Sequence, residues 1–197
     1  MKKVVKFGGS SLANAEQFQK VGEIIRSEES RRYVVPSAPG KRFDGDTKVT
    51  DMLYACYGAA EAGEDFSGKL QAIKMRFQEI IQGLSLDLSL DREFEQIAAD
   101  FSAHAGKEYA ASRGEFLNGK VMAAYLGYEF VDAAEVIRFD KNGVLEAEKT
   151  NRLLEKRLAK CEKAVIPGFY GAYEDGKIKT FSRGGSDVTG SIVARAV

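Results

Sequence analysis

Histidine and cysteine are scarce in this sequence of 197 residues, which contains one histidine and two cysteines. His104 has no second imidazole with which to form a zinc cluster or a serine–histidine pair, so metal hydrolases and triad hydrolases are disfavoured. Cys56 and Cys161 lie far apart, without a CxxC spacing, and each falls in a helix-like segment. We therefore expect two buried thiols in a reducing compartment, and neither a disulfide nor a metal site.

Long apolar runs and an excess of charge of one sign are also lacking. No apolar run approaches the ~20 residues that cross a bilayer, and residues 1–5 do not begin a signal peptide. Lysine plus arginine and aspartate plus glutamate both number 29, and no basic block suggests a nucleic-acid footprint. We expect a cytoplasmic globular protein with one substantial core, and neither nucleic acid nor membrane as a partner.

Strand and helix patterns alternate along most of the chain, which predicts an α/β fold with a mostly parallel sheet. Strands are predicted at 4–7, 33–35, 129–131 and 164–166, a hairpin over 172–181, and helices at 16–26, 50–60, 115–126, 146–160 and after 186. Residues 41–48 have the composition of a mobile loop, and Thr47 or Thr50 could cap the helix that follows. A helical pair within residues 65–110 interrupts the alternation, so we expect a helical lobe inserted at the edge of the sheet.

Three glycine-containing turns follow predicted strands. The first, Lys6-Phe7-Gly8-Gly9-Ser10-Ser11, combines a cation, two glycines and two hydroxyls before a helix, which suits a phosphate group. The others are Gly168–Gly171 and Gly184–Gly185. Because the carboxyl ends of parallel strands share one edge of a sheet, we expect the three turns to converge there on a ligand.

Two further charged motifs admit a structural and a functional interpretation. Ser112 and Glu115 have the spacing of a helix capping box, or Glu115 could face the ligand cleft. Arg183 could hold a carboxylate and Asp187 could contact a cation, or Asp187 could simply cap the last helix with Arg183 as its ion-pair partner.

Taken together, four motifs resemble the catalytic domain of the aspartokinases, a branch of the amino acid kinase family. They are Lys6–Ser11, Ser112–Glu115, Ile166–Phe169 and Ser182–Asp187, in this order and at these separations. The resemblance implies a three-layer αβα fold of the amino-acid (carbamate) kinase type with the helical lobe inserted. It also implies ATP-dependent phosphorylation of L-aspartate to 4-phospho-L-aspartate, the first step toward lysine, threonine and methionine.

The resemblance also assigns roles to individual residues. It places phosphate and ATP contacts on Lys6, Gly8, Gly9, Ser10, Gly184 and Gly185, with Lys6 and Asp187 as the catalytic pair. It places aspartate contacts on Ser37, Thr50, Glu115, Arg183 and Ser186. Arg183 would hold the α-carboxylate and Glu115 the ammonium group, while Asp187 would orient Lys6. Mg²⁺ would enter with ATP, since no acidic cluster suggests a protein cage for the ion.

The sequence departs from the family pattern after residue 187. The family continues with a strand carrying a Thr-Asp motif and a lysine-bearing segment, which bind the nucleotide, and then with two ACT regulatory modules; none of these is present here. We therefore expect residues 1–197 to be the N-terminal part of the catalytic domain, truncated at its C-terminus, with little or no activity alone. The full-length protein is expected to form a homodimer.

Two alternatives remain open at this point. A sister kinase could act on acetylglutamate, glutamate or UMP, although an N-acylated substrate has no ammonium for Glu115 to bind. Alternatively, the domain could bind a small ligand without turnover.

Overall fold

The computed structural model describes residues 2–182 and 184–197, and within them the predicted α/β pattern is confirmed. Four parallel strands form one sheet in the order β1 (Lys3–Phe7), β2 (Arg31–Pro36), β4 (Ala164–Val165) and β3 (Glu129–Phe130). The predicted hairpin is present as the antiparallel pair β5 (Tyr170–Ala172) and β6 (Ile178–Thr180). No helix among the described residues is long and apolar enough to cross a membrane.

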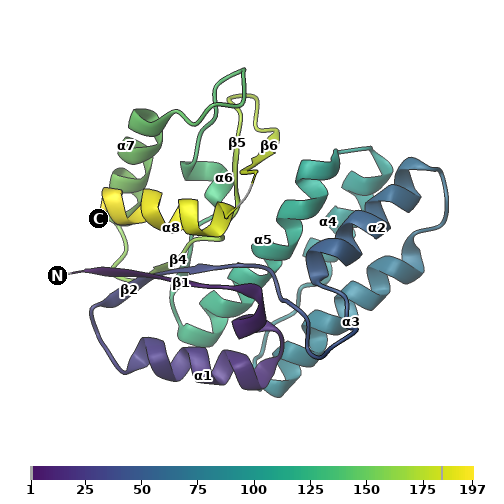
Figure 1. The fold of residues 1–197 in the computed structure, drawn as a ribbon, viewed down its shortest axis with the longest axis horizontal. Coiled ribbons are helices and arrows are strands. Elements are labelled where there is room, and N and C mark those ends of the chain that lie inside the picture. Colours follow the sequence, from purple (N-terminus) through teal and green to yellow (C-terminus); the bar gives the residue numbers. More distant parts are fainter. Residues whose placement is uncertain (1, 183) are drawn as a thin grey trace.

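Helices cover both faces of the sheet because alternate residues of each strand point to opposite sides. Val34 of β2 joins the core beneath α1 (Ala15–Arg26) and α5 (Lys107–Leu126). Tyr33 and Val35 join the core beneath α6 (Ala133–Val136), α7 (Ala147–Leu158) and α8 (Gly185–Ala196). Figure 1 shows α1 on one side of the sheet and α7 and α8 on the other, which gives the expected three layers.

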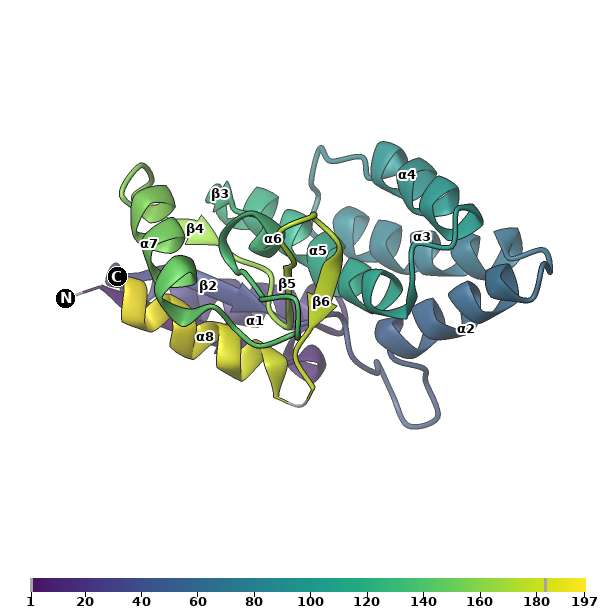
Figure 2. The same ribbon diagram turned by 90° about the horizontal axis from the view of Figure 1, so that it is seen from above.

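The helical lobe consists of α2 (Val49–Glu61), α3 (Ser67–Gly83) and α4 (Asp91–Ser102), which pack against one another and against α5. Figure 2 shows these helices extending from one end of the molecule, away from the sheet. Phe77, Phe94 and Phe101 are buried in this lobe, and their core is continuous with the core beneath α1. The lobe therefore includes α2, which precedes the predicted residues 65–110.

The helix predicted at 16–26 is confirmed as α1, which begins after Asn14, whose side chain caps it, and a short 3₁₀ helix, Gly9–Leu12, precedes it. Two other local predictions were wrong. Neither Thr47 nor Thr50 caps α2, because the residue at the N-cap is Lys48 and no side chain bonds the first turn. Helix α5 begins at Lys107, so Ser112 and Glu115 lie inside the helix and do not form a capping box.

Candidate active site

The end of β1 and the start of α8 meet through an ion pair. Lys6 Nζ lies 3.0 Å from Asp187 Oδ1, and the Lys6 side chain is 28% exposed while that of Asp187 is 70% exposed. A Cβ atom on Gly8 would stand 3.8 Å from the same Lys6 nitrogen. The ammonium group of Lys6 therefore lies over the first glycine turn, where it can contact an anion held by that turn.

The turns after β1 and β2 touch each other through glycines. The Gly40 N–H donates to the Gly9 carbonyl at 2.8 Å, and the Ser37 N–H donates to the Phe7 carbonyl at 3.0 Å. A Cβ on Gly9 would lie 2.7 Å from the Ala38 carbonyl oxygen, and one on Gly40 would lie 2.6 Å from the Gly9 carbonyl carbon. Only glycine permits this approach, so these two glycines are required by the contact between backbones.

Two serines join the second turn to the last helix. Ser37 Oγ donates to Ser186 Oγ at 2.9 Å. Ser186 also covers Gly168 in the turn after β4, because a Cβ on Gly168 would lie 2.5 Å from Ser186 Oγ. These contacts confirm that the three predicted glycine turns converge, where β1, β2 and β4 end at the N-terminus of α8. The reason given for the third turn was wrong, because Gly184 and Gly185 follow β6 of the antiparallel hairpin and not a strand of the parallel sheet.

Glu115 lies in the middle of α5 with its carboxylate buried beside the second turn. The side chain is part of a residue only 6% exposed, and the backbone N–H of Ala38 bonds to it. Among the described residues, no group donates a hydrogen bond to Oε2, although that atom is inaccessible to solvent. Burial raises the pKa of Glu115 to about 7, since desolvation penalises the charged form.

Asn118, one helical turn after Glu115, is a site residue that the sequence analysis missed. Its Nδ2 atom donates to the Ser37 carbonyl at 2.7 Å, and the residue is fully buried. Ser37 and Asn118 are far apart in sequence, so no local pattern could have indicated the bond. Asn118 fixes the second turn against α5.

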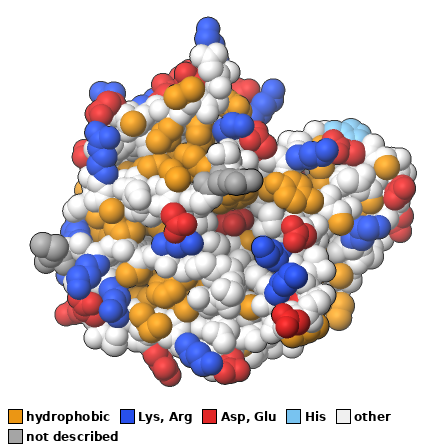
Figure 3. Space-filling view, viewed as in Figure 1, with side chains coloured by type: hydrophobic (Ala, Val, Ile, Leu, Met, Phe, Trp, Pro, Cys, Tyr) orange, Lys and Arg blue, Asp and Glu red, His pale blue; other side chains and the backbone are white. Residues whose placement is uncertain are grey.

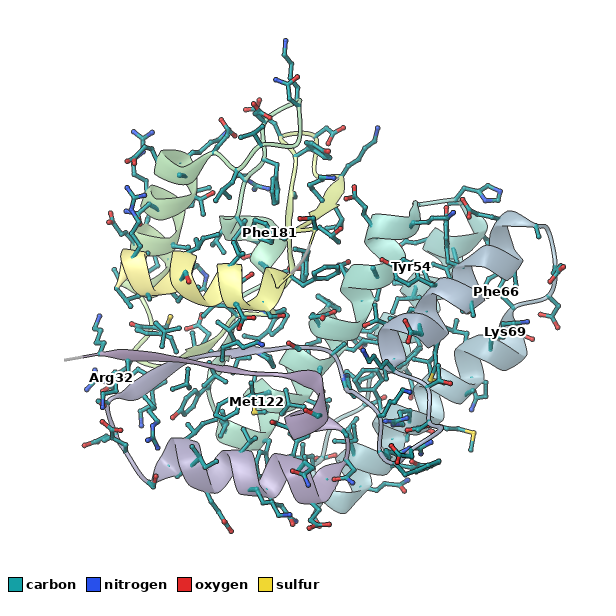
Figure 4. All side chains as sticks on the ribbon, in the orientation of Figure 1. Arg32, Tyr54, Phe66, Lys69, Met122 and Phe181 are labelled. Carbon is teal, nitrogen blue, oxygen red and sulfur yellow. The ribbon has the colours of Figure 1, made fainter. Side chains whose placement is uncertain are left out.

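Tyr54 on α2 is a second residue that the sequence analysis missed. Figure 4 shows it between α2 and α5. The pKa of its hydroxyl is raised by partial burial and by the negative charges of Glu115 and Glu108. The helical lobe therefore presents an aromatic hydroxyl within electrostatic range of the buried carboxylate.

The remaining predicted site residues are placed less centrally. Ser10 is exposed in the 3₁₀ turn, and Thr50 is half-buried in the first turn of α2; among the described residues no side-chain hydrogen bond joins either to the site. Gly184 adopts a left-handed conformation (φ 60°) before α8, and Gly185 is buried against Phe169. Arg183 lies outside the described residues.

A cleft separates the hairpin from the helical lobe. Figure 3 shows the surface hollowed between these two parts, and residues of α4, α5, β6 and the hairpin turn line a cavity of about 690 Å³ there. Glu108, which lines the cleft, joins α5 to β6: its Oε1 accepts from Lys179 Nζ at 2.7 Å and from Thr180 Oγ1 at 3.1 Å. Arg113 of α5 also lines this cleft, with its guanidinium stacked on Tyr109 and Phe116.

Neither cysteine is among the residues that line the cleft, whereas His104 is one of them. Cys56 is buried and Cys161 half-buried, both as free thiols, and burial raises the pKa of Cys56 to about 11. His104 is exposed at the end of α4 with a left-handed backbone (φ 56°). Among the described residues, no group of three or more His, Cys, Asp or Glu side chains could hold a metal ion.

Comparisons with known proteins agree with this geometry. The model of the amino acid kinase family matches residues 1–197. Aspartokinase 3 of Bacillus subtilis is 38% identical over 99% of this chain and 46% of its own length. Lysine-sensitive aspartokinase 3 of Escherichia coli is 25% identical over 98% of this chain and 46% of its own length.

Solved structures show the same relationship. Aspartate kinase of Clostridium acetobutylicum superimposes with a TM-score of 0.95 at 48% identity, covering 100% of this chain and 46% of that one. Aspartokinase III of E. coli, solved with aspartate and ADP, gives a TM-score of 0.82 at 26% identity, with 100% of this chain and 47% of that one covered. The chain thus spans a little under half the length of these relatives.

Proposed function

Since this chain belongs to the amino acid kinase family, we propose that it is the N-terminal part of the catalytic domain of an aspartate kinase. In the reaction, a side-chain carboxylate oxygen of L-aspartate attacks the γ-phosphorus of ATP. The bond from that phosphorus to the β,γ-bridging oxygen breaks, and ADP leaves with the electron pair. The acceptor oxygen is already ionised at neutral pH, so the protein needs to align the reactants and neutralise charge but needs no general base.

The observation that carries this proposal is the buried Glu115 carboxylate. An ionised carboxylate with an unpartnered oxygen in the interior costs several kcal/mol, so the buried position of Glu115 calls for a cation that arrives from outside. The ammonium group of a free amino acid is such a cation, and it can donate to Oε2. The neighbouring Ser37–Ser186 pair supplies polar contacts beside it.

The phosphoryl group would be held at the first glycine turn. Lys6 neutralises charge that spreads over the phosphoryl oxygens, and the backbone N–H groups of Gly8 and Gly9 can donate to them. Asp187, whose Oδ1 lies 3.0 Å from Lys6 Nζ, would hold that ammonium group in place. Ser10, Gly184 and Gly185 border the same edge and would complete the phosphate contacts.

The remaining aspartate contacts follow from the same arrangement. Ser37 and Ser186 would bind the substrate carboxylates, with Arg183 as the guanidinium partner of the α-carboxylate and Thr50 at the lobe side. The E. coli relative was solved with aspartate and ADP, which supports this pair of ligands for the family. We propose ATP with Mg²⁺ bound to its phosphates, because the described residues offer no acidic cluster to hold the ion on their own.

We propose that the full-length protein also contains the region of the relatives that this chain does not span. That region would supply the adenine and ribose contacts, two ACT modules and a homodimer interface. We propose a cytoplasmic enzyme of lysine, threonine and methionine biosynthesis. The 197 residues alone are then expected to bind aspartate better than they turn it over.

Calorimetric titration of L-aspartate into the chain tests the proposal, with acetylglutamate and L-glutamate as competing ligands. We expect selective binding of aspartate that is weakened at least tenfold by Arg183→Ala and by Glu115→Gln. Glu155→Gln, on the exposed face of α7, is the matched control and should bind as the wild type does. Equal or tighter binding of acetylglutamate would overturn the assignment in favour of a sister kinase.

A further inference from the structure

An arginine of the helical lobe reaches into the base of the proposed phosphate site. Arg76 lies on α3 and is 3% exposed. Its Nη2 atom donates to the Gly40 carbonyl at 2.6 Å and lies 3.4 Å from the Ala13 carbonyl. Gly40 belongs to the turn after β2, and Ala13 follows the 3₁₀ helix Gly9–Leu12 that leads out of the first glycine turn, so one guanidinium joins the second turn to the segment that follows the first.

A carboxylate in a third segment of the chain balances the positive charge of Arg76. Asp46, in the loop 41–48 that we expect to be mobile, accepts from Arg76 Nη1 at 2.9 Å. Arg42 of the same loop also donates to Asp46, through Nε at 3.0 Å and Nη2 at 3.1 Å. The Arg76 guanidinium thus joins the second turn, the end of the 3₁₀ helix and the loop 41–48 to α3.

The contact that Arg76 supports tolerates very little displacement. Gly40 and Gly9 approach so closely that no Cβ fits between them, and their hydrogen bond of 2.8 Å is the direct link between the turns. Nothing in this arrangement requires Arg76 for the folding of α3 itself, since the guanidinium bonds to no residue of that helix among those described. Its three partners are all in the segments that border the site.

We propose that Arg76 is a positioning residue that sets the spacing between the turns after β1 and β2, and so the direction of the Gly8 and Gly9 N–H groups. This inference rests on the proposed function for its catalytic consequence, since those N–H groups are the proposed phosphoryl donors. The helical lobe then acts on the phosphate site through one side chain. Lysine cannot replace it, because a single ammonium lacks the planar fork that reaches separate partners.

Amide hydrogen exchange measured by NMR tests the structural half of the proposal without any activity. In Arg76→Lys, we expect the Gly40 amide to exchange at least tenfold faster, while amides in the middle of α3 keep their protection. Arg42→Lys is the matched control, because Arg42 shares Asp46 but contacts neither turn; its Gly40 amide should stay within threefold of the wild type. An unchanged Gly40 amide in folded Arg76→Lys overturns the proposal.

If Arg76→Lys does not fold, Asp46→Asn replaces it, since this variant removes the negative charge that balances Arg76 and leaves both turns intact. We then expect the Gly40 amide to exchange at least threefold faster, and no change would overturn the proposal.

Steady-state kinetics of the full-length enzyme test the catalytic half. Arg76→Lys should lower kcat at least tenfold and leave the KM for L-aspartate within twofold, because Ser37, the proposed aspartate contact in the same turn as Gly40, is held separately by Asn118. A kcat within twofold of the wild type overturns the catalytic role. If the wild type does not phosphorylate aspartate, the proposed function fails, and hydrogen exchange still decides whether Arg76 spaces the turns.

Discussion

Two carboxylates are buried near the same end of the sheet, Asp46 in the loop after β2 and Glu115 in α5, and their surroundings are opposite. Asp46 accepts hydrogen bonds from the guanidinium groups of Arg42 and Arg76, and also from the Arg42 backbone N–H at 2.9 Å. The Arg42 guanidinium beside it holds the pKa of Asp46 well below its usual range. Glu115 has an unpartnered oxygen, and burial raises its pKa to about 7.

The difference separates a charge used to hold the fold from a charge kept for a ligand. Every bond of Asp46 is made within the protein, so its ionised form stabilises the folded chain. Glu115 is desolvated with little compensation, so its ionised form destabilises the folded chain until a cation arrives. Burial alone does not distinguish the two roles; the count of hydrogen-bond donors does.

The largest expected effect comes from removing the satisfied carboxylate. Asp46→Ala leaves the guanidinium of Arg76, which is 3% exposed, without its partner. We expect a loss of about 3 to 5 kcal/mol in the free energy of unfolding, measured by urea denaturation. Asp44→Ala, at an exposed position of the same loop, is the control and should change stability by less than about 0.5 kcal/mol. A loss below about 1 kcal/mol for Asp46→Ala would contradict the contrast between the two sites.

The unsatisfied carboxylate should affect stability with the opposite sign and only in a defined pH window. The pKa of Glu115 is raised from its ordinary value of 4.5 to about 7 in the folded chain. The folded state therefore binds this proton more tightly than the unfolded state does. The stabilisation of the folded chain by the proton is fully present below pH 4.5 and is lost as pH rises through about 7. The stability of Glu115→Gln relative to the wild type should thus increase by about 3 kcal/mol between pH 4 and pH 8.

Urea denaturation of both proteins across this pH range measures that difference. Glu155→Gln, in which an exposed glutamate is replaced, should give a flat difference curve. A flat curve for Glu115→Gln as well would show that the Glu115 carboxylate is not desolvated in the folded chain.

The affinity for aspartate should also depend on the titration of Glu115. If the ammonium group of aspartate pairs with ionised Glu115, the proton must leave before the ligand binds. As pH is raised toward 7, the affinity for L-aspartate, measured by calorimetry, should therefore increase by up to about tenfold, or about 1.4 kcal/mol, for each pH unit. Above pH 7 the affinity should level off. Glu115→Gln should bind more weakly with no such slope. A pH-independent affinity in the wild type would separate Glu115 from the ligand.

Much of the fold could be predicted because its strands and amphipathic helices carry local periodicity. The start of α5 was the main error. That helix is buried on nearly every side, including Ala110, Gly114 and Leu117, so it shows no polar face from which a boundary could be inferred. The serine and glutamate inside it then matched a capping pattern by chance.

The site residues also divide into those that a local motif indicates and those that no local motif indicates. Lys6, Gly9 and Glu115 lie in short motifs, and the structure brings their segments together at the sheet edge. Arg76 and Asn118 act through bonds to backbone carbonyls of Gly40 and Ser37, far from them in sequence. Every residue has a backbone carbonyl, so such a bond requires no particular residue type at the acceptor. The sequence therefore gives no signal for the contacts of Arg76 with Gly40 and of Asn118 with Ser37.

The smallest expected effect on stability belongs to a third carboxylate, which is exposed. Asp187 is 70% exposed and pairs with Lys6, which is 28% exposed. An ion pair this open to water contributes less than about 1 kcal/mol, so Asp187→Asn should barely change urea denaturation. Phosphorylation of aspartate by the full-length enzyme should nevertheless fall at least tenfold, because Asp187 is proposed to orient Lys6.

Glu16→Gln is the control for that last comparison, since Glu16 is equally exposed at 70% and pairs with Lys20 at 2.7 Å. Both variants should lose little stability, but only Asp187→Asn should lose activity. If both variants kept full activity, the Lys6–Asp187 pair would be an ordinary surface ion pair. A large loss of stability in Asp187→Asn would instead place Asp187 with Asp46, among the charges that hold the fold.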